Sequence, residues 1–237
     1  MIKLVRMLAL LLPLLTCHTH YSAPLMFIVI EGLDGSGKTT AAKALSQRLA
    51  ATARVQPIFT YEPNDDMAGG DFIRQVLRRE IPNVRPRTLA LAFAANRLDH
   101  NDRVILPHLA SGRDAVVLCD RYYISSLVYQ SAPGQGLEEI MALNSAARRP
   151  DVVCFLSVTA ANCQARTRHR ELPAELFENK YEERRQAFEI AIQYVAAQGV
   201  PILYIDGNGT PEDTIEQLWQ SLHEFAPERI PAYRSPI

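Results

Sequence analysis

Cysteine is scarce in this chain, and its four residues stand apart as Cys17, Cys119, Cys154 and Cys163 with no CxxC pair. That spacing excludes a disulfide framework and does not match a zinc site. A surplus of positive charge is missing too, because 25 Lys and Arg residues are balanced by 26 Asp and Glu residues among 237, a net charge of -1. Proteins that grip a nucleic-acid backbone without specificity carry a basic surplus, so we expect no nucleic-acid partner.

Internal repeats, low-complexity tracts and long Gly/Ser linkers are also absent, so we expect a single domain. One apolar stretch, residues 7–15, follows Lys3 and Arg6 in the order of a secretory signal, but it is too short to span a bilayer. It is either such a signal, an extension that folding does not need, or the result of a start placed too early. We expect residues 1–25 to lie outside the core, a domain at 26–226, a short tail at 227–237 and no membrane partner.

Apolar runs alternate with helical patterns from residue 26 onward. The runs expected to form strands are residues 27–30, 55–60, 115–118, 152–156 and 202–205. The expected helices are residues 38–51, 72–79, 87–109, 138–147, 160–168, 175–197 and 211–225. Strands that are apolar throughout and alternate with helices predict an α/β fold, with a five-stranded parallel sheet covered by helices on both faces.

A glycine-rich loop follows the first expected strand and precedes a helix. Residues 31–40 read EGLDGSGKTT and fit GxxxxGK[ST] in the context that a phosphate-binding loop (P-loop) requires. Glycines let backbone N–H groups surround phosphate oxygens, and the helix N-terminus adds the positive end of its dipole. Lys38 supplies a charge for the β- and γ-phosphates, and the Thr39 hydroxyl can hold Mg²⁺. The residues expected to bind ATP are Gly32, Leu33, Asp34, Gly35, Ser36, Gly37, Lys38, Thr39 and Thr40.

A P-loop alone does not distinguish a switch, a motor and a kinase. GTP switches add DxxG and NKxD, but DMAG at 66–69 follows no clear strand end, and NKYE at 179–182 ends in Glu inside a charged helix. The third strand leads into Asp120 and Arg121, at the sheet edge where open α/β folds bind ligands. There Asp120 can order Mg²⁺ and Arg121 can bridge phosphates, although the two could also form a plain surface ion pair.

Phe93, Arg97 and His100 share one helical face by their i, i+4, i+7 spacing. A ring beside a guanidinium is suitable for stacking a base and bonding its edge. By spacing alone, however, a core phenylalanine beside a solvated arginine and histidine is the more frequent arrangement.

Five segments occur in the order found in thymidylate kinases. They are EGLDGSGKTT, Glu62-Pro63, FAANR at 93–97, DRYYISSLVYQ at 120–130 and RPD at 149–151. The chain resembles that family from about residue 26 to about residue 222, and DRY-x-x-SSL-x-YQ after FAANR is the discriminating part. The resemblance implies a P-loop kinase fold with a mobile helical lid, and transfer of the ATP γ-phosphate to dTMP to give dTDP and ADP.

The resemblance also implies how the nucleoside is held. Phe93 stacks on the thymine ring, Arg97 bonds the base edge, and Ser126 and Gln130 complete the base pocket. Tyr129 lies against the deoxyribose and disfavours a 2′-hydroxyl.

Other implied roles concern the phosphates. Arg74 and Arg121 hold the acceptor phosphate, and Asp34 lies near the sugar 3′-hydroxyl and the metal. The residues implied to bind dTMP are Glu62, Arg74, Phe93, Arg97, Arg121, Ser126, Tyr129 and Gln130. We expect Thr39 and Asp120 to hold Mg²⁺, and the catalytic set to be Lys38, Asp34, Arg121, Arg166 and Arg170.

The last two arginines belong to the expected lid. Thr159 can cap a helix that carries Arg166, Arg168 and Arg170, of which the first and last share a face. None of the variable P-loop positions 33–36 is basic, so the lid must supply the arginine that thymidylate kinases place over the phosphates. The alternative is a solvated basic helix end favoured by the helix dipole.

One departure from the family and three alternative functions stay open, and one of these functions is that of another nucleoside monophosphate kinase. Bacterial relatives often read EPGGT where this chain has EPNDD at 62–66, so the phosphate side of the pocket can differ. Glu62-Pro63 is also similar to deoxynucleoside kinases, in which that glutamate acts as a base. A regulator that binds nucleotide without turnover is the non-enzymatic alternative. The family further implies a homodimer through residues 87–109, and consumption of ATP implies a cytoplasmic enzyme.

Overall fold

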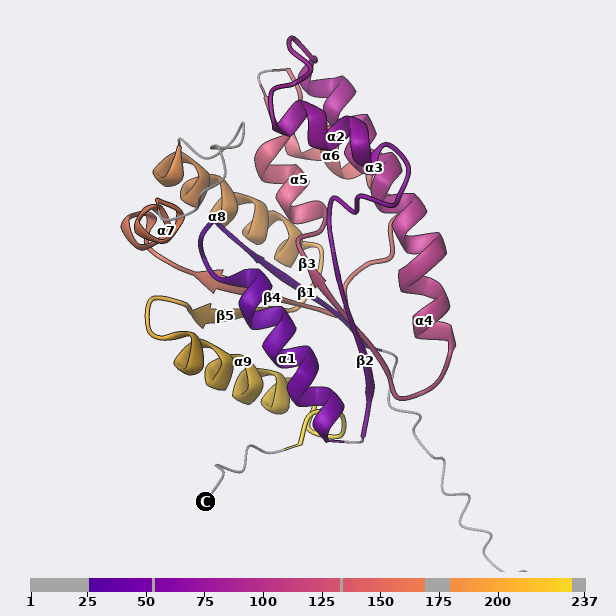
Figure 1. The fold of residues 1–237 in the computed structure, drawn as a ribbon, viewed down its shortest axis with the longest axis vertical. Coiled ribbons are helices and arrows are strands. Elements are labelled where there is room, and N and C mark those ends of the chain that lie inside the picture. Colours follow the sequence, from indigo (N-terminus) through magenta and orange to yellow (C-terminus); the bar gives the residue numbers. More distant parts are fainter. Residues whose placement is uncertain (1–25, 53, 133, 169–179, 232–237) are drawn as a thin grey trace, which may run out of the picture.

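The computed structural model describes residues 26–52, 54–132, 134–168 and 180–231 (Figure 1). The expectations for residues 1–25, for Arg170 and for the rest of the lid at 171–179 therefore lie outside the described residues. Within the described part of the chain, no helix is both long enough and apolar enough to cross a lipid bilayer.

Five parallel strands form one sheet in the order β2-β3-β1-β4-β5. The strands are β1 (Met26–Gly32), β2 (Gln56–Tyr61), β3 (Ala115–Asp120), β4 (Val152–Ser157) and β5 (Ile202–Asp206). The predicted five-stranded parallel sheet is confirmed, because each predicted run lies in one strand to within one residue.

The helices are α1 (Lys38–Ala51), α2 (Gly70–Leu77), α3 (Pro86–His100), α4 (Leu106–Ala110), α5 (Tyr123–Tyr129), α6 (Leu137–Leu143), α7 (Ala160–Thr167), α8 (Tyr181–Ala197) and α9 (Pro211–Phe225). A five-residue π-helical turn, η1 (Asn101–Ile105), joins α3 to α4. The long helix predicted at 87–109 is thus interrupted by a change of helical type. Thr159 caps α7 as predicted, and Thr210 caps α9 in the same way, each accepting a backbone N–H with its side-chain oxygen.

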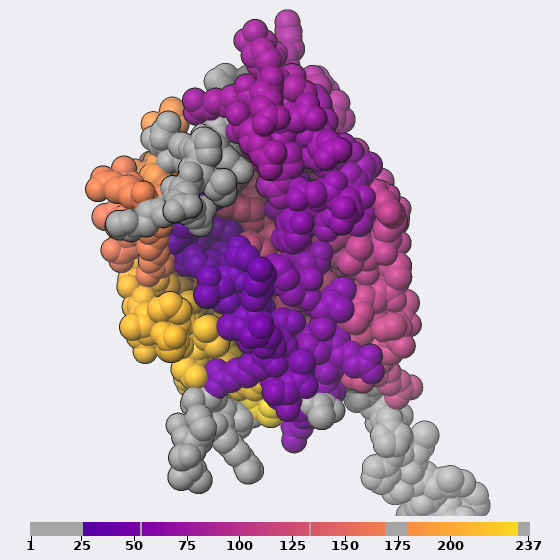
Figure 2. Space-filling model, in the orientation of Figure 1, coloured from indigo at the N-terminus to yellow at the C-terminus, as the bar shows by residue number. Residues whose placement is uncertain are grey.

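Helices cover both faces of the sheet, as predicted (Figure 1). Successive β1 side chains point to opposite faces, so Phe27 and Val29 join one core while Ile28 and Ile30 join the other. The first core is closed by α5, α8 and the α3–η1–α4 segment, and the second by α1 and α9. The space-filling view shows α9 in yellow beside α1 in indigo (Figure 2). Ile230 is fully buried in the second core, so the chain packs on the domain beyond α9.

No helix is predicted at residues 123–129, where the structure places α5. The segment YISSLVY is rich in β-branched and aromatic residues, which are weak helix formers. Six of its seven residues, 123–128, are buried, so no polar face reveals a helical period. Tertiary packing therefore determines this helix.

The register brings three loops to one edge of the sheet. Ile30 of β1 and Tyr61 of β2 both pair with Asp120 at the end of β3. The P-loop, the Glu62 loop and the Asp120–Arg121 turn consequently emerge side by side at the carboxyl ends of their strands, where ligands bind in such sheets.

Candidate active site

The P-loop connects β1 to α1 in a conformation that depends on glycine. Gly35 and Gly37 have φ angles of 81° and 93°. A Cβ on Gly35 would lie 2.5 Å from the carbonyl oxygen of Cys163, so α7 packs directly on the loop. The Lys38 ammonium is buried inside the loop and donates to the Leu33 carbonyl at 2.6 Å. Its burial, together with the nearby positive charge of Arg121, lowers its pKa to about 8.

Thr39 and Asp120 meet at the mouth of the P-loop. The Thr39 hydroxyl donates to Asp120 Oδ2, and Asp120 Oδ1 is buried without a partner among the described residues. A hydroxyl beside an unsatisfied carboxylate oxygen fits a hard cation such as Mg²⁺. These two residues line a cavity of about 200 Å³, the phosphate cavity, together with Asp34, Gly35, Gly37, Lys38, Thr40 and Arg121.

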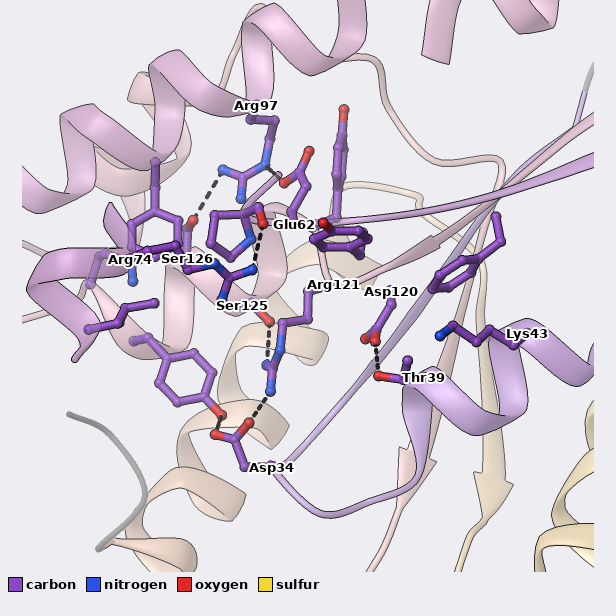
Figure 3. A pocket seen from close by; sticks show the side chains of 18 residues that line it. Asp34, Thr39, Lys43, Glu62, Arg74, Arg97, Asp120, Arg121, Ser125 and Ser126 are labelled. Atoms are coloured by element: carbon purple, nitrogen blue, oxygen red, sulfur yellow. Dashed lines mark hydrogen bonds and ion pairs between the residues drawn. The ribbon is translucent and has the colours of Figure 1, made fainter. Parts of the chain in front are cut away.

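A larger cavity of about 360 Å³, the acceptor cavity, lies between α2, α3, α5 and the sheet edge (Figure 3). It contains all eight residues that the sequence implied for the acceptor: Glu62, Arg74, Phe93, Arg97, Arg121, Ser126, Tyr129 and Gln130. Three further lining residues, Asp34, Thr39 and Asp120, were predicted for other roles in the site. Seven were not predicted as site residues, namely Lys43, Phe59, Tyr61, Pro63, Leu77, Tyr122 and Ser125. Asp34, Thr39, Asp120 and Arg121 line both cavities, which places the P-loop at the boundary between them.

Arg121 is held at that boundary by the P-loop and α5 (Figure 3). Its guanidinium pairs with Asp34 of the P-loop and donates to Ser125 Oγ of α5 at 3.1 Å. The other oxygen of Asp34 accepts a hydrogen bond from Tyr129 at 3.0 Å. The ion pair of Arg121 is therefore made with the P-loop and not with its neighbour Asp120.

Arg97 lies at the inner end of the acceptor cavity and is only 2% exposed. Its Nε donates to Glu62 at 2.6 Å, and its Nη1 donates to Ser126 at 3.1 Å and to Asn144. His100 is fully buried as well. The alternative of a solvated arginine and histidine is therefore wrong, while Phe93 does line the cavity from the same helix.

Comparison with known proteins agrees with this geometry. A family model described as thymidylate kinase matches residues 30–218. The probable thymidylate kinase of Pyrococcus abyssi is 42% identical over 147 residues, which cover 61% of this chain and 70% of the relative. The thymidylate kinase of Bdellovibrio bacteriovorus is 33% identical over 208 residues, covering 84% and 95%. The chain belongs to the thymidylate kinase family.

The sheet order and the helices on both faces are those of the P-loop kinase fold that the thymidylate kinase family implies. Membership of a kinase family also means that the chain uses ATP. One family motif now has a structural reason. Asn96 of FAANR accepts from the Asn64 backbone and donates to the Asn64 and Ala68 carbonyls, so it fixes the loop after β2.

That loop carries the departure from EPGGT. The Asp65 carboxylate accepts from Arg74 Nε at 2.5 Å, and Arg74 Nη2 donates to the Pro63 carbonyl at 3.0 Å. The loop thus holds one edge of the Arg74 guanidinium and leaves Nη1 directed away from both contacts. At the position of the second glycine of EPGGT, this chain has a carboxylate bound to an arginine of the acceptor cavity.

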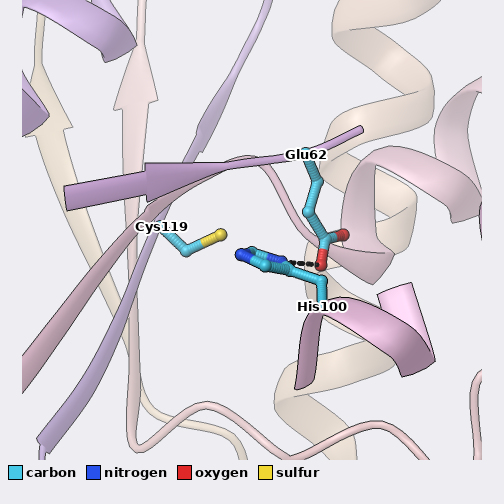
Figure 4. Close-up of side chains that lie close together, drawn as sticks. All are labelled: Glu62, His100 and Cys119. Carbon is cyan, nitrogen blue, oxygen red and sulfur yellow. Dashed lines mark hydrogen bonds and ion pairs between the residues drawn. The ribbon is translucent and has the colours of Figure 1, made fainter. Parts of the chain in front are cut away.

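The possible ligand atoms of Glu62, His100 and Cys119 lie within 4.8 Å of one another (Figure 4). The imidazole uses both nitrogens, with Glu62 at 3.0 Å from Nδ1 and Thr60 at 2.6 Å from Nε2. The second Glu62 oxygen binds Arg97, and burial raises the pKa of the Cys119 thiol well above its usual value. A metal would need a free nitrogen and a thiolate, so we assign this cluster to a buried network that supports Arg97.

A third cavity, of about 260 Å³, lies on the other side of the P-loop. Arg166 of α7 lines it and donates to the carbonyls of Gly207 and Gly209 at 2.9 and 3.3 Å. Arg168, at the end of α7, is exposed and lines none of the three cavities. Of the predicted lid arginines, Arg166 is thus beside the P-loop, and Arg170 lies outside the described residues.

Proposed function

We propose that dTMP binds in the acceptor cavity and the ATP phosphates in the phosphate cavity, and that the γ-phosphate passes between them at their shared wall. As a member of the thymidylate kinase family, the chain phosphorylates dTMP to dTDP. One observation carries the proposed placement: Asp34, Thr39, Asp120 and Arg121 line both cavities. Phosphoryl transfer needs donor and acceptor held in line at a few ångströms, and a common wall provides this.

The inner end of the acceptor cavity suits a thymine base. Hydrogen bonds between Arg97 and described residues use Nε and Nη1, so Nη2 is left to donate to a base carbonyl. Gln130 Oε1 is buried without a partner among the described residues and can accept the N–H of the base. Phe93 then stacks on the ring, and Tyr129, whose hydroxyl is bound to Asp34, lies under the sugar and excludes a 2′-hydroxyl.

The outer end suits the acceptor phosphate. Arg74 and Arg121 supply two guanidinium groups, which recognise phosphate oxygens by paired hydrogen bonds. Arg121 also borders the phosphate cavity, so it can contact the acceptor phosphate and the transferred group in turn.

Lys38 and the backbone N–H groups of residues 35–40 bind the β- and γ-phosphates. The pKa of Lys38 is lowered by burial and by the charge of Arg121, and phosphate oxygens will favour the charged form of the ammonium. Thr39 and Asp120 would hold Mg²⁺, which when bound neutralises charge on the β- and γ-phosphates. Arg166 and Arg170 close the site from the lid and exclude water that would hydrolyse ATP.

A deoxynucleoside kinase, the alternative function, would phosphorylate a free nucleoside instead of dTMP. In those enzymes the glutamate of the Glu-Pro pair acts as a base toward a sugar hydroxyl. Here both Glu62 oxygens are committed to Arg97 and His100 inside the protein.

Release of ADP from ATP and Mg²⁺ should be measured across nucleoside monophosphates and free nucleosides. We expect dTMP to be the best acceptor. A stronger response to thymidine would favour a deoxynucleoside kinase, and turnover without any acceptor would favour an ATPase.

We also propose a homodimer through α3 and α4. Leu91, Leu98 and Leu106 are 50%, 42% and 41% exposed, and they are spaced by seven and eight residues along this segment. Large apolar side chains in a row on one helical segment are typical of an interface.

The enzyme is proposed to work in the cytoplasm, where ATP is available. Recovery of a processed protein outside the cytosol would overturn that location.

A further inference from the structure

Glu31 is a fully buried carboxylate near the end of β1. Its Oε1 accepts the backbone N–H groups of Tyr122 at 2.8 Å and Ser125 at 3.0 Å, and its Oε2 accepts the Ser125 hydroxyl at 2.7 Å. Burial raises the pKa of Glu31, while the Arg121 charge and these three donors oppose that rise. A buried group with three hydrogen bonds to one turn has a specific structural task.

That task is to cap α5 from another element. Tyr122 precedes the first residue of α5 and makes no side-chain cap, whereas Ser125 is the third residue of the helix. The N–H groups that Glu31 accepts are the ones a helix leaves without an intrahelical partner. A strand residue therefore supplies what a local Ser, Thr or Asp usually supplies.

The cap extends to Arg121 through Ser125. The Ser125 hydroxyl donates to Glu31 and accepts from Arg121 Nη1 at 3.1 Å. Arg121 has a φ angle of 69°, a left-handed conformation that is unfavourable for a non-glycine residue. The next N–H along the chain, that of Tyr122, is bound by Glu31, so the carboxylate holds both the backbone turn and the side chain of Arg121.

We infer that Glu31 and Ser125 are positioning residues, which fix the Arg121 guanidinium at the wall shared by the acceptor and phosphate cavities. Glu31 has no exposed surface and cannot touch a substrate. It acts on the reaction only through Arg121, and the inference rests on the proposed function for its kinetic consequence. The sequence motif EGLDG thus includes a residue that serves the DRY segment as well as the loop it precedes.

Kinetics of Glu31→Gln and Ser125→Ala, alone and combined with Arg121→Lys, test this role. We expect each single variant to lower kcat roughly ten- to a hundredfold, because a displaced catalytic group loses that much. In the Arg121→Lys background, Glu31→Gln should lower kcat by less than a further factor of about two, because the side chain that Glu31 positions is already altered. Leu222→Ala, in the core on the opposite face of the sheet, is the control for lost stability. Any decrease in kcat that it causes should multiply with the decrease caused by Arg121→Lys.

The inference would be overturned if Glu31→Gln lowered kcat by the same factor in the Arg121→Lys background as in the wild type. An NMR spectrum of arginine Nε–H groups, with Arg121 assigned by its absence in Arg121→Lys, gives a readout that needs no turnover. We expect the Arg121 signal to shift and broaden in Glu31→Gln and Ser125→Ala, and not in Leu222→Ala. An unchanged signal overturns the inference whichever acceptor the enzyme uses, whereas wild-type inactivity toward dTMP would count only against the proposed function.

Discussion

The Lys38 ammonium donates to the Leu33 carbonyl, 2.6 Å away on the other side of the P-loop. The buried ammonium thus binds a carbonyl of its own loop, and the carboxylates of Asp120, Asp34 and Glu31 only partly offset the effect of its burial. Because this burial costs free energy, replacing Lys38 with a neutral residue should not weaken the fold.

We expect Lys38→Ala to lose most transfer activity, because the charge balances phosphate charge that develops during the reaction. The melting temperature should stay the same or rise. Steady-state kinetics and thermal unfolding measure the two effects. Near-normal turnover would show that the loop does not bind the phosphates as proposed.

Phe93→Ala tests the base site. The ring lines the acceptor cavity but neither the phosphate cavity nor the third cavity beside the P-loop. We expect KM for dTMP to rise by about tenfold or more, as is common when a stacking or packing contact is removed, with KM for ATP nearly unchanged. Phe93→Tyr keeps a ring and serves as the control. Equal increases in both KM values would refute the stacking role.

The lid arginines should differ in the kinetic constant that each one affects, KM for ATP or kcat. Arg166 is anchored to the Gly207 and Gly209 carbonyls, so Arg166→Ala should mainly raise KM for ATP. Arg170→Ala should lower kcat by at least about a hundredfold, because it removes a charge over the transferred group. Arg168→Ala is the mild control. If all three variants turn over like the wild type, no lid arginine acts in catalysis.

The dimer proposal predicts a change of mass in solution. Leu98→Glu places a charge in the middle of the leucine row and should shift the protein from dimer to monomer in sedimentation velocity. Ile190→Glu changes a side chain of α8 that is 57% exposed and lies outside that row, so it should leave the mass unchanged. A monomeric wild type, or a dimer in both variants, would contradict the interface.

Two buried thiols give a pH-dependent prediction. Burial raises the pKa of Cys163 to about 11 and that of Cys154 further. Unfolded thiols ionise near pH 8.5, so above that pH the folded state binds more protons and the free energy of unfolding falls as pH rises. At pH 8, iodoacetamide should label Cys154 and Cys163 only after denaturant is added, with glutathione as a reactive reference. Rapid labelling in the native protein, detected by peptide mass spectrometry, would contradict their burial.

Local motifs made much of the site predictable. The P-loop and Asp120 are recognisable because strand, loop and charged residue are adjacent in the chain, and a parallel sheet brings such loops to one edge. The acceptor residues came from a family resemblance, and all eight line one cavity. Spacing alone favoured a solvated Arg97, because the partners that bury it are 29 to 47 residues away in sequence.

Long-range contacts explain the remaining misses. The helix at 123–129 is determined by packing on every side and by a cap from Glu31, which lies 91 to 94 residues earlier. No local pattern records either cause. The contact of Asp65 with Arg74, nine residues further along the chain, was not predicted either.

The π-helical turn η1 sets the rotation of α4 about the helix axis relative to α3. In a regular helix, the eight residues from Leu98 to Leu106 would turn the side chain about 80° away from the face of Leu91 and Leu98. A π turn absorbs about one extra residue, so the effective separation is near seven and Leu106 returns to that face. Deleting one residue from 101–105 should therefore convert the π turn to regular α-helix and keep Leu106 on the face of Leu91 and Leu98, because seven residues complete nearly two turns of an α-helix.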